Sequence, residues 1–226
     1  MKEPFAIAID GPSGAGKSTL AKAVAAELGC VYLDTGAIYR TVAYHMILMG
    51  ISPKDKDGVK RLIDDVNIKI DFPGDGKQHM LLNGHDVTDE IRTPEVSVGA
   101  SQVSAYPVVR DVLLDLQRDT ARHSSVVMDG RDIGTVVLPN ADVKIFLTAD
   151  VKVRAKRRLK ELEDKGEKVT FAEVLKDMEE RDERDSNRAV APLRCAPDAV
   201  RVDTSDCGLE ESRDRILRVI REKLGA

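Results

Sequence analysis

The sequence predicts an α/β fold in which a five-stranded parallel sheet is flanked by helices. Five short apolar runs are typical of buried strands, and helical patterns separate each run from the next. Strands that alternate with helices favour βαβ units and therefore a parallel sheet. The expected strands are residues 5–10, 31–35, 125–130, 143–148 and 199–204.

The first helix has the clearest boundaries in the sequence. From Lys17 onward, Leu20, Val24 and Leu28 recur at helical spacing and therefore share one face. Gly29 follows directly, and glycine commonly ends a helix because it adopts the left-handed conformation without strain. The pattern predicts a helix over residues 17–28.

A small antiparallel insert is expected at about residues 63–93. Every second residue from Val66 to Phe72 is apolar, which places these side chains on one face of a strand. The next apolar run ends at Asn83-Gly84, and Asn-Gly is a strong signal for a tight hairpin turn. The segment predicts a hairpin attached to the α/β core.

Composition narrows the classes of partner. Lys and Arg total 35 against 39 for Asp and Glu, a net charge of −4, so no overall positive field would attract nucleic acid or an anionic membrane. No apolar run approaches the roughly 20 residues that span a bilayer, and the N-terminus lacks a signal-peptide pattern. The three cysteines lie far apart, which favours free thiols. These observations together predict a cytoplasmic protein with no nucleic-acid or membrane partner. We also expect a monomer, because no apolar surface stripe is evident.

A glycine-rich stretch between the first strand and the first helix carries the strongest functional signal. GPSGAGKST satisfies the pattern G-x-x-x-x-G-K-[ST], in which backbone amides surround phosphate oxygens. Lys17 is expected to reach the β- and γ-phosphates of ATP, and the Ser18 hydroxyl to ligate Mg²⁺. The expected ATP-binding residues are Gly11, Pro12, Ser13, Gly14, Ala15, Gly16, Lys17, Ser18 and Thr19.

The phosphate loop alone does not separate a kinase from a switch. A GTPase should carry an Asn-Lys-x-Asp motif that reads guanine, and none occurs in the sequence. A small kinase instead needs a second phosphate-binding site and a lid that excludes water.

Two clusters at expected strand ends fit an acceptor site. Arg40 follows the second strand, and DGRDIGT at residues 129–135 follows the third. The carboxyl ends of parallel strands meet at one edge of a sheet, where ligands bind. Asp129 could orient Mg²⁺ or its waters, with Arg131 and Asp132 directed towards the acceptor. The alternative for each cluster is a turn whose Asp and Gly only shape the backbone.

A third cluster lies on the expected helix that starts near residue 171. Its apolar residues form a stripe at helical spacing that ends at Met178. The same spacing then continues into Arg181, Arg184, Asp185 and Arg188, so we expect these four to face a polar ligand. The neighbouring residues 182, 183, 186 and 187 are expected to be solvated. Surface pairing of the charges is the alternative for the whole segment.

These motifs, in this order, resemble those of bacterial cytidylate kinases, within the P-loop nucleoside monophosphate kinases. The resemblance runs almost end to end and includes the hairpin insert. It is carried by DGPSGAGKST (10–19), LDTGAIYR (33–40), DGRDIGTVVLPNADVKIFL (129–147) and RDERDSNRAVAPL (181–193). It implies a P-loop kinase core and a helical lid. It also implies an enzyme that transfers the γ-phosphoryl group of MgATP to CMP or dCMP.

The resemblance also implies a role for individual residues. It places the acceptor phosphate on Arg40, Arg131 and Arg188, the cytosine on Ser101, Arg110 and Asp132, and the ribose on Arg181 and Asp185. Thr35 is expected near the same ligand without a specific role. Arg157 and Arg158 resemble lid arginines that reach the triphosphate, with solvated helix charges as the alternative. The expected catalytic residues are Lys17, Arg131, Arg188 and Arg157, and the metal is expected near Ser18 and Asp129.

The chain is expected to be one kinase domain, residues 1–226, because no linker separates independent domains. The expected core is residues 1–34, 106–149 and 189–226. An acceptor-binding region would cover residues 35–105, and the lid about 150–188. Two alternative functions stay open: a P-loop kinase for another small acceptor (UMP, AMP or a shikimate-like hydroxyl) and a nucleotide-gated switch.

Overall fold

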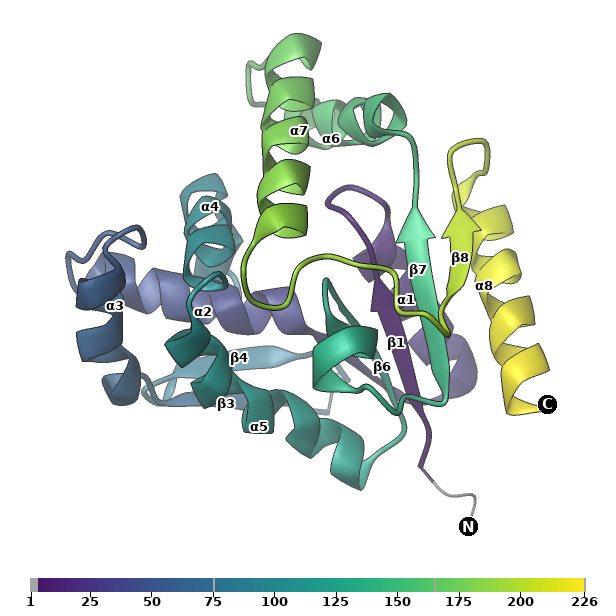
Figure 1. The fold of residues 1–226 in the computed structure, drawn as a ribbon, viewed down its shortest axis with the longest axis horizontal. Helices are drawn as coiled ribbons and strands as arrows, with labels where there is room; N and C mark the ends of the chain where they lie inside the picture. Colours follow the sequence, from purple (N-terminus) through teal and green to yellow (C-terminus); the bar gives the residue numbers. More distant parts are fainter. Residues whose placement is uncertain (1–3, 75, 165, 226) are drawn as a thin grey trace. The chain divides into compact units, whose positions relative to one another are not determined.

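The computed structural model describes residues 4–74, 76–164 and 166–225 (Figure 1). A five-stranded sheet contains β1 (Ala6–Asp10), β2 (Val31–Asp34), β6 (Val126–Gly130), β7 (Val143–Thr148) and β8 (Val200–Asp203), in the order β2-β6-β1-β7-β8. β7 pairs in parallel with β1 on one side and with β8 on the other. The predicted fold class is confirmed, and each strand lies within one or two residues of its expected limits.

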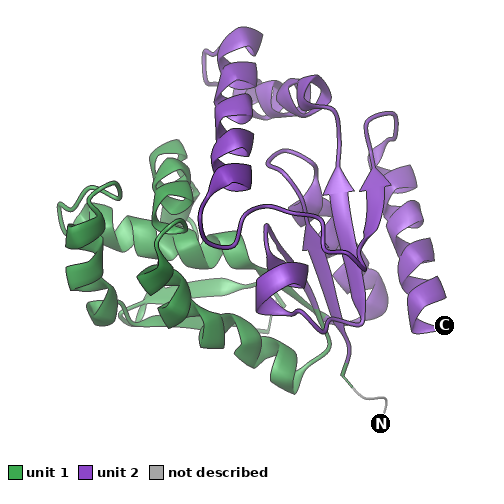
Figure 2. Cartoon of the chain, in the orientation of Figure 1, with its two compact units in different colours: residues 1–4, 31–126 green, residues 5–30, 127–226 purple. Residues whose placement is uncertain are grey.

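The chain divides into two compact units (Figure 2). Unit 1 comprises residues 1–4 and 31–126, and unit 2 comprises residues 5–30 and 127–226. None of the described helices has both the length and the apolar character needed to cross a bilayer.

In unit 2, two helices pack together against the sheet: α1 (Lys17–Leu28) and α8 (Leu209–Leu224). α1 ends where its sequence predicts, because Gly29 adopts φ 63° as its C-cap. The central strand β1 is an apolar run because Ile7, Ala8 and Ile9 are completely buried.

Two charged helices of unit 2 follow β7: α6 (Val151–Asp164) and α7 (Phe171–Asn187). They pack on each other through a small apolar cluster that contains Ala155, Leu162, Val174 and Met178. Thr170 caps α7, since its hydroxyl accepts from the Glu173 N–H while the Glu173 carboxylate accepts from the Thr170 N–H. The apolar stripe thus fixes one face of α7, and the cap fixes where the helix starts.

Unit 1 combines a small sheet with helices. The sheet has the order β3 (Ile68–Asp71), β4 (His79–Leu82), β5 (His85–Asp86), and its strands are antiparallel. Asn83 (φ 50°) and Gly84 (φ 84°) form the predicted tight turn between β4 and β5. The remaining elements are α2 (Thr35–Leu48), α3 (Lys56–Leu62), η1 (Ile63–Asp65), η2 (Glu90–Arg92), α4 (Pro94–Val103) and α5 (Pro107–His123).

A buried carboxylate ties β1 to the segment after β6. Asp10, the last residue of β1, accepts from the Ile133 N–H at 2.8 Å and from the Gly134 N–H at 2.7 Å. These amides start a π-helical turn, η3 (Ile133–Val137), directly after Arg131 and Asp132. Burial raises the pKa of Asp10 to about 6, although the two N–H groups act in the opposite direction. Asp10 therefore fixes the backbone that carries two of the predicted site residues.

At about pH 4, replacing Asp10 with Asn should destabilise the protein by about 1–3 kcal/mol, because an amide nitrogen cannot accept the second N–H, whereas both oxygens of the carboxyl group can. Asp142→Asn is the matched control. The Asp142 carboxylate accepts from the Ala6 N–H at an exposed position, and its replacement should cost no more than about 0.5 kcal/mol. Urea unfolding with an unchanged m value measures both costs. Equal costs for the two variants would contradict the role of Asp10.

The Asp10 contribution should also depend on pH. The folded-state pKa of about 6 lies above that of an unfolded Asp, so the folded protein holds this proton more tightly. The contribution is therefore fully present below about pH 4 and is lost as the pH rises to about 6. The difference in unfolding free energy between wild type and Asp10→Asn should shrink over this range.

Candidate active site

The loop between β1 and α1 has the geometry that phosphate binding requires. A Cβ at Gly11 would lie 1.9 Å from the Leu147 carbonyl oxygen, so only glycine fits where the loop leaves β1. Gly16, with φ 85°, is the N-cap of α1 and provides no side-chain cap for the first amides of the helix. Uncapped amides at a helix N-terminus favour an anion.

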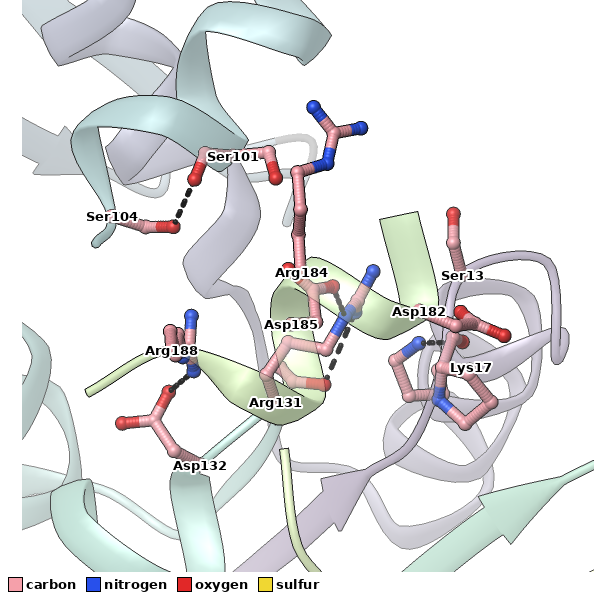
Figure 3. Close-up of polar contacts among 12 residues, drawn as sticks. Ser13, Lys17, Ser101, Ser104, Arg131, Asp132, Asp182, Arg184, Asp185 and Arg188 are labelled. Atoms are coloured by element: carbon pink, nitrogen blue, oxygen red, sulfur yellow. Dashed lines mark hydrogen bonds and ion pairs between the residues drawn. The ribbon is translucent and has the colours of Figure 1, made fainter. Parts of the chain in front are cut away.

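Lys17 lies at the start of α1 and is almost completely buried. Its Nζ donates to the Pro12 carbonyl oxygen of its own loop at 2.7 Å (Figure 3). Burial, and next the Arg131 guanidinium, hold the pKa of Lys17 well below its usual range, whereas Asp129 and Asp10 act to raise it. Its ammonium group is thus held at the phosphate loop by one carbonyl bond.

The residues predicted to hold a metal are in contact. The Ser18 hydroxyl donates to the Asp129 carboxylate at 2.9 Å, and Asp129 is buried near the end of β6. Among the described residues, no cluster of three or more His, Cys, Asp or Glu side chains could hold a metal. The pair offers the oxygen donors that Mg²⁺ prefers, and it fits an ion whose other ligands are phosphate oxygens and water.

Two ion pairs cross between the segment after β6 and the end of α7 (Figure 3). Arg131 Nε donates to the Asp185 carboxylate at 2.9 Å, and an Arg188 terminal nitrogen donates to the Asp132 carboxylate at 3.1 Å. Arg188 Nε also donates to the Ala191 carbonyl oxygen. Burial acts to raise the pKa of Asp185, but the guanidinium groups of Arg131 and Arg181 outweigh it and hold the pKa below its usual range. Four predicted acceptor residues are therefore brought together by the fold.

The prediction for α7 was right in part. The side chains of Asp185 and Arg188 are buried and Arg181 is half-buried, whereas Glu183, Ser186 and Asn187 are exposed, as their spacing predicts. Arg184 was placed wrongly, because its side chain is exposed and its Nε donates to the Glu180 carbonyl oxygen of its own helix. The prediction that Asp182 is a solvated surface residue was also wrong. It lies four residues after the buried Met178 and therefore on the same stripe.

The partner of Asp182 is Arg154, a residue for which no role was predicted. This buried guanidinium donates to the Ala149 carbonyl oxygen at 2.8 Å, to the Ser13 carbonyl oxygen at 3.0 Å and to Asp182 at 2.7 Å. A Cβ at Gly14 would meet Met178 at 2.6 Å and Arg154 at 3.3 Å, so both side chains pack on the phosphate loop. The signal in the sequence was the position of Arg154 on the apolar face of α6, beside Ala155.

The two predicted lid arginines lie elsewhere on α6. Arg157 donates to the Thr204 carbonyl oxygen at 2.6 Å, and Arg158 pairs with Glu161 at 3.1 Å on the helix surface. In the hydrogen bonds of the described residues, it is Arg154 that reaches the phosphate loop from α6.

Unit 1 holds the other predicted acceptor residues. Arg40 pairs with Asp34 at 2.7 Å, and the buried Thr35 opens α2. Arg110 is buried, donates to the Ser104 carbonyl oxygen at 3.2 Å and lies 5.6 Å from the centre of the Tyr39 ring. The Ser101 carbonyl oxygen accepts from the Ser104 hydroxyl at 3.0 Å.

The parallel sheet, the phosphate loop between β1 and α1, and the buried lysine define a P-loop nucleotide-binding fold. The fold is similar to that of an uncharacterised protein from Eubacterium ventriosum, with a TM-score of 0.50 at 15% identity over 96% of this chain and 98% of that one.

Comparison with known families then identifies the group. The model of the family described as "Cytidylate kinase" matches residues 7–222. A cytidylate kinase from Carboxydothermus hydrogenoformans is 50% identical over 96% of this chain and 97% of its own. One from Fervidobacterium nodosum is 49% identical over 96% of each chain. The chain belongs to the cytidylate kinase family.

Truncating Arg154 should weaken both the fold and the phosphate loop. Arg154→Ala removes the bonds to the half-buried Asp182 carboxylate and to the Ser13 carbonyl oxygen, at a cost of about 1.5–3 kcal/mol for the charged hydrogen bond. We expect a lower midpoint of urea unfolding and a raised KM for ATP. Arg158→Ala, which breaks an exposed pair on the same helix, is the control and should cost no more than about 1 kcal/mol. If Arg154→Ala lowered the free energy of unfolding no more than Arg158→Ala, the bonds from Arg154 to Asp182 and Ser13 would not stabilise the fold.

Proposed function

We propose that this protein transfers the γ-phosphoryl group of ATP to CMP or dCMP, producing ADP and CDP or dCDP. The observation that carries the proposal is the pairing of a phosphate loop with a second set of arginines in a member of the cytidylate kinase family. The phosphate loop suits the triphosphate of the donor, and the arginines suit the phosphate of the acceptor.

We assign the binding of ATP, the phosphoryl donor, to residues 11–19. Loop amides and the N-terminus of α1 bind the phosphates, and Lys17 exchanges the Pro12 carbonyl for phosphate oxygens. Ser18 and Asp129 would hold Mg²⁺, which when bound supplies positive charge beside the β- and γ-phosphates. Residues 150–188 are proposed to act as a lid that keeps water from the phosphoryl group, with Arg157 as a further contact to the triphosphate.

The acceptor needs no general base. The second pKa of a phosphate monoester is about 6, so its oxygen is already ionised at neutral pH. The obstacle is the repulsion between two anions, and planar guanidinium groups reduce it through bidentate hydrogen bonds. We assign this role to Arg40, Arg131 and Arg188. Among the residues of unit 2 that we assign to the acceptor, three guanidinium groups (Arg131, Arg181, Arg188) and two carboxylates (Asp132, Asp185) leave a net charge of +1 for the anion.

The nucleoside part of the acceptor is assigned to residues whose groups match it. Ser101, Arg110 and Asp132 can supply donors and acceptors to the amine, ring nitrogen and carbonyl of cytosine. Asp185 can accept from a sugar hydroxyl, and Arg181 can donate to the ribose. Thr35 is assigned to the same ligand because it lies in the motif that carries Arg40.

The enzyme is proposed to work in the cytoplasm as a monomer. All three cysteines, Cys30, Cys195 and Cys207, are free thiols, which suits a reducing compartment.

A coupled assay of ADP release tests the function directly. The purified protein is given ATP and Mg²⁺ with CMP, dCMP, UMP, AMP or shikimate in turn. The proposal requires ADP release that depends on CMP or dCMP and exceeds that with the other acceptors. Release without any acceptor would favour a nucleotide switch, and preference for another acceptor would favour a different kinase.

Arg188→Ala should lower kcat/KM for CMP by about 10³-fold, because a guanidinium directed at the reacting phosphates has an effect of this order. The KM for ATP should change little. Arg184→Ala is the matched control, since Arg184 is exposed on the same helix and donates only to a carbonyl of that helix in the bonds that the structure shows. Unchanged CMP kinetics in Arg188→Ala, with the fold intact by circular dichroism, would remove Arg188 from the acceptor site.

A further inference from the structure

The carboxylate of Asp34 holds Arg40 in place. Asp34 is the N-cap of α2: one carboxylate oxygen accepts from the Ala37 N–H at 3.0 Å, and the other accepts from an Arg40 terminal nitrogen at 2.7 Å. Burial acts to raise the pKa of Asp34, but the Arg40 guanidinium, the Ala37 N–H and the charge of Arg92 outweigh it and lower the pKa. The carboxylate therefore stays ionised, and its position fixes one side of the guanidinium.

The rest of the Arg40 guanidinium is left for another ligand. Its Nε is buried and has no hydrogen-bond partner among the described residues. A buried donor without a partner is costly, so it marks a place where an acceptor atom belongs. A Cβ at Gly36 would lie 3.0 Å from Asp34 and 3.1 Å from Arg40, so glycine keeps the space beside the pair open.

Asp34 is itself held by a side chain from the small sheet. Gln78 directly precedes β4. Its Oε1 accepts from the Asp34 N–H at 2.7 Å, and its Nε2 donates to the Asp34 carbonyl oxygen at 3.2 Å. One amide thus satisfies both backbone groups of Asp34, as a neighbouring strand would.

This pairing has a definite place in the sheet. β2 is the first strand in the order β2-β6-β1-β7-β8, so β6 is its single neighbour in the described sheet. Asp34 is the last residue of β2, where the strand turns into α2. Gln78 therefore bonds both backbone groups of the last residue of this edge strand.

We propose that Gln78 is a positioning residue for Arg40, and that the three-stranded sheet acts on the acceptor phosphate through the chain Gln78–Asp34–Arg40. The proposal rests on the proposed function, in which Arg40 binds that phosphate. Gln78 fixes the backbone of Asp34, the Asp34 carboxylate fixes the guanidinium, and the guanidinium presents its remaining donors to the phosphate.

Gln78→Ala tests the first link. Two hydrogen bonds to Asp34 are lost, and an effect of about tenfold on acceptor binding is expected. The KM for CMP should therefore rise about tenfold, while kcat at saturating CMP and the KM for ATP stay within about twofold. Gln78→Glu keeps the acceptor for the Asp34 N–H but loses the donor to the Asp34 carbonyl. It should shift the KM for CMP in the same direction, and it replaces the alanine variant if that one does not fold.

His79→Ala is the matched control. The His79 ring nitrogen lies 2.6 Å from the Asp86 carboxylate, so this variant also removes a polar contact of the small sheet but not one to Asp34. Its KM for CMP should stay within about twofold of wild type. An equal rise in His79→Ala and Gln78→Ala would show a general effect of the sheet and would overturn the proposal, as would an unchanged KM in both Gln78 variants.

A double-mutant cycle with Arg40→Ala separates the two ways in which the proposal can fail. If Gln78 acts through Arg40, Gln78→Ala should have no further effect on the KM for CMP in the Arg40→Ala background. Independent effects that multiply would overturn the positioning role while leaving Arg40 in the acceptor site. An unchanged KM for CMP in Arg40→Ala alone would instead remove Arg40 from the proposed function, and the inference with it.

Discussion

Two ion pairs join residues 131–132 to the end of α7 and hold these predicted acceptor residues of unit 2 in place. Arg131 and Asp132 are consecutive, whereas Asp185 and Arg188 lie about one helical turn apart, so each charge meets its opposite. A shift of either segment would separate both pairs at once. Because removing one partner leaves an uncompensated buried charge, at a cost of about 3–5 kcal/mol, the arrangement is stiff. Asp10 adds to this stiffness by fixing the backbone immediately after Asp132.

The same principle recurs at other cations within each unit. Arg40 is paired with Asp34, and Arg154 with Asp182, while Lys17 donates to the Pro12 carbonyl oxygen. Each cation is therefore oriented before any nucleotide arrives. Orientation in advance is what electrostatic catalysis requires, because the groups need not reorganise as charge moves in the transition state. Each guanidinium in these pairs has a carboxylate neighbour, and this opposite charge offsets the repulsion between positive charges that lie close together.

Local patterns in the sequence predicted most of the fold. Apolar runs predicted the five strands, Gly29 predicted the end of α1, and Asn83-Gly84 predicted the hairpin turn. Each of these features depends on residues that lie close together in the chain. The phosphate loop was recognisable for the same reason. Helical spacing separated the buried Asp185 from its exposed neighbours on α7, but it misplaced Arg184 and Asp182.

The contacts that the sequence could not reveal join distant residues. Arg154 and Ser13 are 141 residues apart, and Gln78 and Asp34 are 44 apart. No local spacing encodes such a pair, since it exists only after the strands and helices have packed. The position of Asp182 was predicted wrongly for a related reason. A charged residue on a highly charged helix is usually exposed to solvent. Asp182 is held away from solvent by Arg154, which lies on another helix.

The amide of Gln78 also bears on the solubility of the protein. An edge strand with open backbone groups is a template on which a strand of another molecule can add, and this is a route to aggregation. β2 is only four residues long, and at its last residue both backbone groups are bonded to Gln78. A side chain that cannot itself be extended into a strand therefore occupies two backbone groups that a strand of another molecule could bond.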